Sequence, residues 1–399
     1  MTKFNSSIAP FLLIGVFSLV FSGCSGSGDD YAQNAIEIPI KSDYPYSESS
    51  IDQVVSNESF GLNTEGSIFS QILNGTNKLS GVNTGFLTSG ESVAQYLFED
   101  NLIILDTEYN ELISYSISQN EITKIASFGR GPGELTQSVD LNVLNGRVYV
   151  GRGDRKISVF NCSNQKAVSS DSVCQYSKTI DLPVTPVDVA VISENEFAIL
   201  GFYNTDTPEG FVLEEGLRVN NSIFVVDSTG VVQRQFGDLY DTHGHWMLQS
   251  SMSTGKIELL GMDTIVLYYD RLPYLYYLAT DGELISKHEF SNFNLGTQRY
   301  SPATGYRENV FQDYSLITAV SKKGTHQVIF EITHYDNLTD QLGSVDWAFE
   351  RDYYLYDITT TSYTFVGSTS ELESTTGKYL PINDDVISII DGSMFFNGF

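Results

Sequence analysis

The chain has 399 residues, of which 41% are hydrophobic and 13% aromatic, so it is long enough for a large core and too apolar to be disordered throughout. Its 50 acidic and 22 basic residues give a formal net charge of -28. Nucleic acid and anionic membrane surfaces are excluded as partners, because phosphate binding needs clustered lysine and arginine. The acidity fits either a solubility or salt adaptation or a cation-attracting surface, and it names no ligand.

The N-terminus carries an export signal. Lys3 precedes an apolar run from about Pro10 to Phe21, which has the length of a signal-peptide core and is too short to span a bilayer. The run ends in Phe21-Ser22-Gly23-Cys24, which resembles the bacterial lipobox, although Phe21 stands where Leu is commonest. The resemblance implies a signal peptide over residues 1–23 and a lipid on Cys24. An ordinary secretory signal is the alternative.

Residues 24–60 are expected to tether the lipid to a folded body over residues 61–399. The first of them, Ser25 to Asp30, are flexible and acidic, and they resemble the surface-export signals of Bacteroidota lipoproteins. No other stretch approaches 18 apolar residues, so the lipid would be the only membrane attachment. We therefore expect a lipid-anchored envelope protein in the outer membrane, with the leaflet left open and exposure at the cell surface as one of the two alternatives.

Cys162 and Cys174 bracket a polar segment with strand-like residues on both sides. This pattern predicts a disulfide across a hairpin loop in an oxidising compartment. A metal or catalytic role is the alternative, but neither cysteine has a histidine near it in sequence.

Beyond the signal, the sequence shows short apolar or alternating runs separated by Gly, Asp, Asn and Ser, which predicts an all-β chain. Six runs stand out, and their centres lie about 45, 50, 67, 63 and 59 residues apart, the size of a propeller blade with loop insertions. The runs are 102–105, 148–150, 197–200, 264–267, 328–330 and 386–390. We expect a six-bladed β-propeller of four-stranded antiparallel blades, with seven blades, or five and an extra sheet, as alternatives.

The last unit breaks off early, since only Ser393 to Phe396 follows its second strand. An unfinished blade would expose an unpaired edge. We therefore expect an N-terminal strand from about residues 67–86 to close the ring.

The segment Phe128-Gly129-Arg130-Gly131-Pro132-Gly133-Glu134-Leu135 resembles the blade-end signature of bacterial six-bladed β-propeller lipoproteins related to NHL-repeat propellers, as found in Bacteroidota. The likeness is strongest from Val93 to Phe160 and implies the fold and the envelope location expected above. Physically, the glycines allow a turn with positive φ between blades, and Pro132 stiffens it. A phosphate-binding loop would need a helix after it, whereas 138–143 reads as a strand.

Long insertions are expected on one face of the propeller. With strands A to D ordered from centre to rim, the B–C insertions 204–221 and 335–351 and the D–A insertions 237–255, 291–313 and 367–378 all leave on the same side. Long loops on one side of a rigid scaffold are typical of a binding face.

Aromatic and charged residues near that face are the ligand-binding candidates. They suit sugar stacking, a peptide surface or a cationic patch, with ordinary loop packing and salt bridges as the alternative readings. The candidates are Arg130, Arg152, Arg155, Tyr203, His243, His245, Trp246, Tyr306, Arg307 and His334. His243 and His245 alone do not define a metal site, so we assign neither a metal nor a cofactor, with calcium or another divalent cation as the alternative.

No nucleophile-elbow, zinc-protease or EF-hand motif occurs. The sequence therefore favours a non-catalytic module that binds a glycan, a peptide or an envelope protein. A hydrolase or lyase at the central funnel, with or without a metal, is the first alternative, and a purely structural assembly role is the second.

Overall fold

The computed structural model of the protein describes residues 36–37, 53–55, 82–87, 92–98, 100–163, 173–202, 221–238, 254–261, 263–294, 298–300, 307–309, 313–323, 326–337, 347–372, 378–382, 385–390 and 393–397. Every regular element in these ranges is a β-strand, as expected. No helix there is long and apolar enough to cross a bilayer.

The first three sheets are four-stranded and antiparallel, with the strands in chain order from the centre outward. The first contains β4 (Ser92–Phe98), β5 (Asn101–Asp106), β6 (Glu111–Ser116) and β7 (Glu121–Ala126). The second contains β8 (Ser138–Leu144), β9 (Arg147–Arg152), β10 (Lys156–Cys162) and β11 (Cys174–Asp181). The third contains β12 (Thr185–Ser193), β13 (Glu196–Phe202), β14 (Asn221–Asp227) and β15 (Val232–Asp238).

The next sheet has a fifth strand that the repeat pattern does not predict. It contains β16 (Gly255–Leu260), β17 (Thr264–Tyr269), β18 (Tyr274–Ala279), β19 (Leu284–Phe290) and β2 (Gln53–Val55). The added strand β2 pairs in parallel with the outer strand β19, from His288↔Gln53 to Phe290↔Val55. Within the described residues, five sheets are four-stranded blades, and this one is a four-stranded antiparallel blade, β16 to β19, with β2 added at its outer edge.

Two further four-stranded sheets follow. One contains β22 (Tyr314–Lys323), β23 (Gln327–Asn337), β24 (Trp347–Asp357) and β25 (Ser362–Leu372). The other contains β26 (Lys378–Ile382), β27 (Asp385–Ile390), β28 (Ser393–Asn397) and the N-terminal strand β3 (Val82–Leu87), which pairs antiparallel with β28. A small sheet joins β1 (Ile36–Glu37), β20 (Gln298–Tyr300) and β21 (Arg307–Asn309). Strands β1 and β2 both fall within the segment expected to be a tether.

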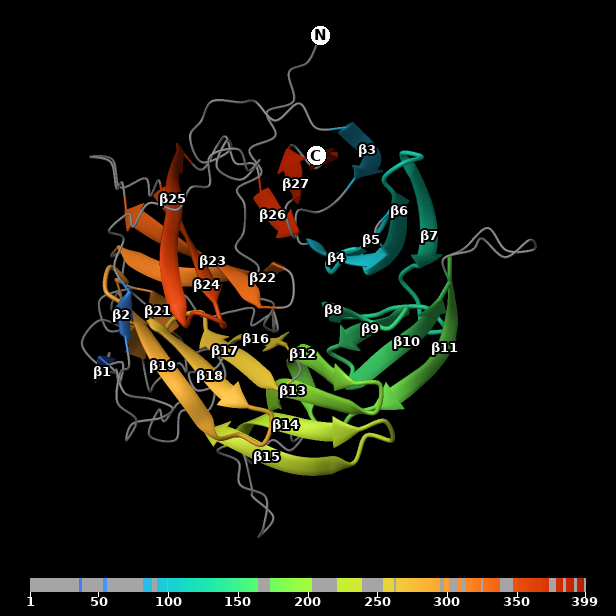
Figure 1. The fold of residues 1–399 in the computed structure, drawn as a ribbon, viewed down its shortest axis with the longest axis horizontal. Coiled ribbons are helices and arrows are strands. Elements are labelled where there is room, and N and C mark those ends of the chain that lie inside the picture. The colour runs from blue at the N-terminus through green and yellow to red at the C-terminus, as the bar shows by residue number, and fades with distance from the viewer. Residues whose placement is uncertain are drawn as a thin grey trace, which may run out of the picture.

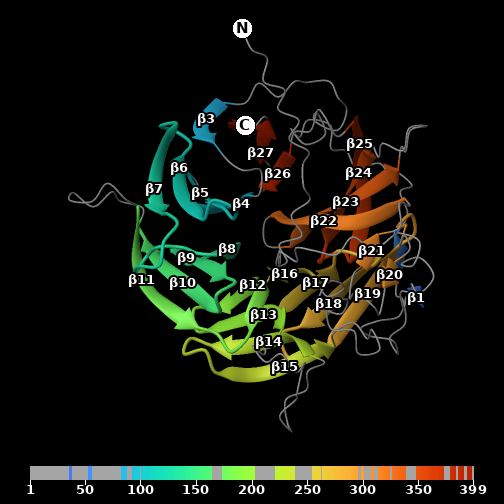
Figure 2. The same cartoon turned by 180° about the vertical axis from the view of Figure 1, so that it is seen from behind.

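The sheets surround a central axis, as both views along that axis show (Figures 1 and 2). The innermost strands contact one another in the order β4, β8, β12, β16, β22, β26 and back to β4. This is the arrangement of a β-propeller, and it confirms the predicted fold class of four-stranded antiparallel blades around an axis.

The core lies in layers between neighbouring sheets. Middle strands such as β5 and β17 are buried on both faces, because each sheet packs against a neighbour on either side. One apolar layer joins β8–β11 to β12–β15 through Tyr149, Val159 and Phe197, and its neighbour joins β12–β15 to β16–β19. The first of the six apolar runs picked out in the sequence, Leu102 to Leu105, is fully buried in β5.

The strand order fixes which connections share a face. In each antiparallel blade, the turn between the second and third strands and the link to the next blade leave on the same side, which we call the insertion face. The expected insertions 204–221, 237–255 and 291–313 join strands in this way. The predicted insertions 335–351 and 367–378 are too long, because parts of them are strand. Strand β23 extends to Asn337, β24 begins at Trp347 and β25 extends to Leu372.

The predicted disulfide is present between Cys162 and Cys174. These residues end β10 and begin β11, and they are register partners. Their hairpin lies opposite the insertion face, since it joins the third and fourth strands of its blade.

Candidate functional site

The glycine signature forms a compact loop on the insertion face, residues 128–135, which we call the glycine loop. Phe128 and Leu135 form an isolated bridge that closes it, and Gly129 N donates to Leu135 O at 3.0 Å. Leu135 N donates to Ser127 O at 2.9 Å. Strand β8 follows the loop, so the prediction of a turn rather than a phosphate-binding loop before a helix is confirmed.

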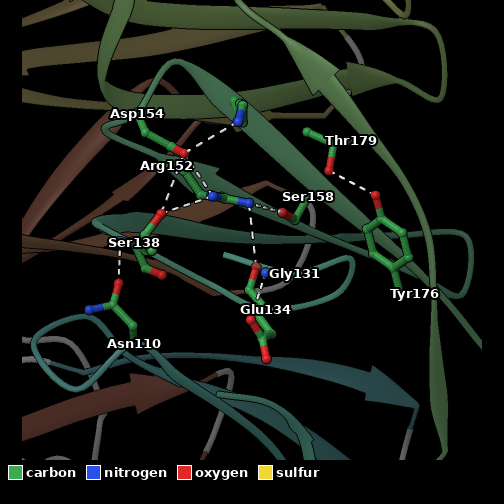
Figure 3. Close-up of polar contacts among 11 residues, drawn as sticks. Asn110, Gly131, Glu134, Ser138, Arg152, Asp154, Ser158, Tyr176 and Thr179 are labelled. Atoms are coloured by element: carbon green, nitrogen blue, oxygen red, sulfur yellow. Dashed lines mark hydrogen bonds and ion pairs between the residues drawn. The ribbon is translucent and has the colours of Figure 1, made fainter. Parts of the chain in front are cut away.

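The carboxylate of Glu134 folds back onto this loop. Gly131 N donates to Glu134 Oε2 at 2.6 Å, and Glu134 N donates to Gly131 O at 3.0 Å (Figure 3). A side chain at Gly129 or Gly131 would meet that carboxylate, and Gly133, at φ +80°, lies against Tyr176. The glycines therefore serve the close approach of Glu134 and of the outer strand β11.

Arg152 lies beneath the glycine loop and is only 6% exposed. Its Nη2 forms an ion pair with Asp154 Oδ2 at 2.7 Å, and Nη1 donates to Ser158 Oγ at 3.1 Å and to Glu134 O at 3.4 Å (Figure 3). For Arg152, the structure shows the salt bridge that was the alternative to ligand binding, with Asp154 as the partner. Arg152 supports the loop from inside instead of presenting its charge to a ligand.

Arg130 and Arg155 behave differently, because both are exposed. Arg130 belongs to the glycine loop and Arg155 to the turn between β9 and β10. The two segments are linked, since Gly153 N donates to Gln137 O at 2.7 Å and Thr136 Oγ1 to Asp154 Oδ2 at 3.4 Å. The structure therefore places one exposed arginine on the loop between two blades and another on a turn of the second blade, and the backbone just after that loop is bonded to this turn.

Three exposed aromatic residues lie on this loop, against it, or beside a residue bonded to the start of β8. Phe128 is 69% exposed at its start, and Tyr176, at 37%, lies against Gly133. Tyr109 is 56% exposed in the turn after β5, where the next residue, Asn110, accepts a hydrogen bond from Ser138 N at 2.7 Å. These are the only aromatic members of the set of exposed large hydrophobic residues in the described ranges.

We call these five residues the rim patch: Tyr109, Phe128, Arg130, Arg155 and Tyr176. Sequence reasoning found its arginines and missed its aromatics. Phe128 and Tyr176 resemble ordinary strand residues in the sequence, and only the loop geometry shows that they are exposed. The position of Tyr109 in a turn was a usable signal.

A second polar group lies along the axis, on the first strands of three consecutive blades. Asp140 on β8 and Asp188 on β12 follow β-bulges at the same place, and Lys256 is the second residue of β16. Ile257 N donates to Asp188 Oδ2 at 2.8 Å, which ties β12 to β16. Within the described residues, the buried Asp188 Oδ1 has no hydrogen-bond partner.

Burial raises the pKa of Asp140 to about 6, while the charge of Lys256 opposes this shift. Burial, and then the charge of Asp140, raises the pKa of Asp188. Burial alone would lower the pKa of Lys256, but the carboxylates of Asp188, Asp140 and Asp270 raise it. Near neutral pH this cluster therefore combines carboxyl groups that can hold a proton with one ammonium group.

No three Asp, Glu, His or Cys residues gather in a metal-binding arrangement within the described ranges. The cluster contains no histidine among its described members. Sequence reasoning did not single out Asp140 or Asp188, because their proximity depends on the packing of neighbouring blades. The repeated pairs Val139-Asp140 and Val187-Asp188, one blade apart, were the available signal.

His334 on β23 belongs to a third polar group, which links three strands. Its Nδ1 lies 2.8 Å from Ser315 Oγ, and its Nε2 lies 3.3 Å from Asp352 Oδ2. Ser368 Oγ donates to Asp352 Oδ1 at 2.5 Å. Burial favours a higher pKa for Asp352, but the hydrogen bonds from His334, Ser368 and Tyr354 and the charge of His334 together lower it.

Ser315, His334 and Asp352 are the residue types of a nucleophilic triad, but their setting is structural. Ser315 is 2% exposed, and its Oγ accepts a hydrogen bond from Asn294 N at 2.9 Å. A nucleophile must reach its substrate. The group therefore clamps residues 292–294, at the start of the connection between β19 and β22, onto the blade.

The other predicted ligand residues are not brought together by the described structure. Arg307 begins β21, and nothing further is assigned to its side chain. Tyr203, His243, His245, Trp246 and Tyr306 lie outside the described residues, as does Cys24.

No protein-family model matches this sequence, and no curated protein matches it. Solved structures do match. A Bacteroides fragilis protein whose name proposes export aligns with a TM-score of 0.52 and 13% identity, over 85% of this chain and 89% of that one.

Two other solved structures match less closely. A streptogramin B lyase gives a TM-score of 0.42 at 10% identity, over 80% of this chain and 96% of that one. A Bacteroides thetaiotaomicron protein of unknown function gives 0.40 at 10% identity, over 79% and 74%. At such identities a likeness shows the fold alone, and of these three structures the Bacteroides fragilis protein is the one with a TM-score above 0.5. The chain is a β-propeller that shares its fold with that protein.

Proposed function

We propose that the protein is a lipid-anchored binding module of the cell envelope, exported through residues 1–23 and attached at Cys24. In this proposal the propeller has six blades, and β3 closes the ring by completing the sheet of β26–β28. The insertion face binds a glycan, a peptide or an envelope protein without catalysis. Two observations support the closure. The inner strands contact one another in a closed cycle from β4 through β26 back to β4, and β3 pairs with β28.

The observation that carries the binding role is the rim patch. Exposed aromatic rings beside exposed arginines are typical of recognition surfaces, since rings supply apolar contact area and guanidinium groups supply directed hydrogen bonds. The loop beneath is held by Glu134 and Arg152, so the patch is fixed before a ligand arrives.

The test is calorimetric titration of the full chain, carrying Cys24→Ser to prevent lipidation, with a panel of oligosaccharides and envelope peptides. We expect at least one ligand to bind and to be lost in the double variant Phe128→Ala, Tyr109→Ala. Leu87→Ala, which removes an exposed apolar side chain on β3, is the control. Binding that survives the double variant would place the function elsewhere.

The envelope location has a separate test. Cells that express the full chain and are fed a labelled fatty acid are expected to label the protein, and Cys24→Ser is expected to abolish the label. A labelled Cys24→Ser protein, or an unlabelled parent, would contradict the anchor.

A hydrolase or lyase at the central axis is the second candidate, and the observation that favours it is the pair of buried carboxyl groups of Asp140 and Asp188 on neighbouring inner strands. A carboxyl group with a pKa near neutrality can act as a general acid. If the funnel is catalytic, Asp188→Asn abolishes turnover of a bound glycan while affinity at the rim patch is unchanged. Slow cleavage that is unaffected by Asp188→Asn would rule out this role.

A further inference from the structure

Arg155 stands in a backbone conformation that favours other residues. Its φ of +62° lies in the left-handed region, where L-residues with long side chains are disfavoured. In the preceding blade the corresponding residue, directly before the third strand, is Asn110, with φ +55°. Asparagine tolerates this conformation well, so the turn does not need an arginine.

The strained backbone is held in place from outside the turn. Leu182 N donates to Arg155 O at 2.8 Å, which fixes the turn to the connection that follows β11. Arg155 is the only charged residue among the described non-glycine residues with positive φ. Strain of this kind at an exposed position is expected where the side chain itself has a role.

The side chains of Arg155 and Arg130 have no acidic partner within the described ranges. Other arginines there do: Arg147 pairs with Glu194, Arg234 with Glu196 and Arg351 with Glu331. In a chain with 50 acidic residues, two exposed arginines on linked segments, neither with an ion pair in the described ranges, are unusual. Their charge is therefore left for a ligand, and a carboxylate matches the planar guanidinium group best.

The surroundings favour a saccharide over a peptide strand. Tyr109, Phe128 and Tyr176 offer exposed rings, which suit the apolar face of a sugar. The outer strand β11 is an edge, but its pairing with β10 is broken by a bulge between Val159 and Phe160 and ends in the disulfide. Bulges of this kind discourage the addition of another strand.

We infer that the rim patch binds an acidic saccharide, with Arg130 and Arg155 on its carboxylate and the aromatic rings on its sugar faces. This inference rests on the proposed binding function and specifies its ligand class. The charge of the ligand is the new element, because the net charge of the protein alone would repel an anion.

The test compares oligogalacturonate, which carries a carboxylate on each sugar, with its neutral methyl ester, by calorimetric titration of the full Cys24→Ser chain. We expect the acid to bind more tightly than the ester. Arg155→Asn and Arg130→Gln should each weaken binding of the acid about tenfold, as expected for a lost hydrogen bond to a charged group. Arg147→Gln, on the opposite face of the same blade, should not.

Thermal unfolding of Arg155→Asn separates a role in binding from a role in folding. If arginine is kept there for its side chain, the variant is at least as heat-stable as the parent while it binds the acid more weakly. A lower midpoint in Arg155→Asn would overturn the strain argument.

The remaining outcomes divide between the two proposals. Equal affinity for acid and ester would overturn the inference and leave the binding function intact. Binding of polyglutamate but not of oligogalacturonate would replace the saccharide with an acidic peptide. If no probe binds and no ligand of the wider panel depends on the rim patch, the proposed function itself fails.

Discussion

Two connections between neighbouring blades are held in place by different interactions. The glycine loop, between β7 and β8, is held by backbone hydrogen bonds and by one carboxylate, that of Glu134. The connection after β19 is held by the buried group of Ser315, His334 and Asp352. The glycine loop needs few side chains to hold its shape, so Phe128 and Arg130 are exposed on it. The connection after β19 is held by polar side chains that are hydrogen-bonded to one another inside the blade.

The largest effect is expected from the buried clamp. Asp352→Ala removes the acceptor for His334, Ser368 and Tyr354 at once, and should lower the free energy of unfolding by about 3 kcal/mol. Urea denaturation measures this change. Ligand binding at the rim patch should be unchanged below the transition, so a loss of binding without a loss of stability would contradict the comparison.

The stability that the buried group of Ser315, His334 and Asp352 provides should also decrease at low pH. Because the pKa of Asp352 is lowered in the folded protein, its stabilising effect is present above the unfolded value of 3.8 and is lost as the pH falls through the folded value. Asp352→Asn is therefore expected to flatten the stability profile below about pH 4. An unchanged acid limb in urea titrations would show that the group does not act in this way.

The buried cluster along the axis, which contains Asp140, Asp188 and Lys256, should give the free energy of unfolding the opposite pH dependence. The pKa of Asp140 is raised to about 6, so the folded state holds a proton that the unfolded state has released, and stability falls as the pH rises from about 4 to about 7. We expect a fall of roughly 2 kcal/mol, reduced in Asp140→Asn. Urea midpoints across this range test it, with Asp181→Asn, at an exposed position at the end of β11, as the control.

The smallest effect is expected at the glycine loop. Glu134→Ala frees Gly131 N at an exposed site, which costs about 1 kcal/mol. The same variant should weaken ligand binding at the rim patch more than its effect on stability suggests, because the loop that carries Arg130 loses its brace. Wild-type affinity in Glu134→Ala would show that the patch needs no such support.

The sequence was sufficient for features that depend on neighbours along the chain. Turn chemistry predicted that the glycine signature forms a turn before a strand, and the cysteine spacing predicted the disulfide. Alternation and spacing predicted the strands and the propeller, because each blade repeats one local pattern.

Features that depend on packing between distant segments were missed. Strand β2 has only three residues, too few for a periodic signal, and it is a strand because the edge of β19 accepts it. Arg152 and Arg155 look alike in the sequence, yet one is buried beneath the glycine loop and the other is exposed. Asp140 and Asp188 meet only because consecutive blades pack around an axis.

The fifth strand has a mechanical consequence. Strand β2 precedes β3 in the chain, so tension applied at the N-terminal end reaches the three register pairs of β2 with β19 before it reaches β3. Detaching β2 would free the edge of β19 and leave the pairing of β3 with β28 intact. A pulling force applied at the N-terminus would therefore separate β2 from β19 before it acted on the pairing of β3 with β28.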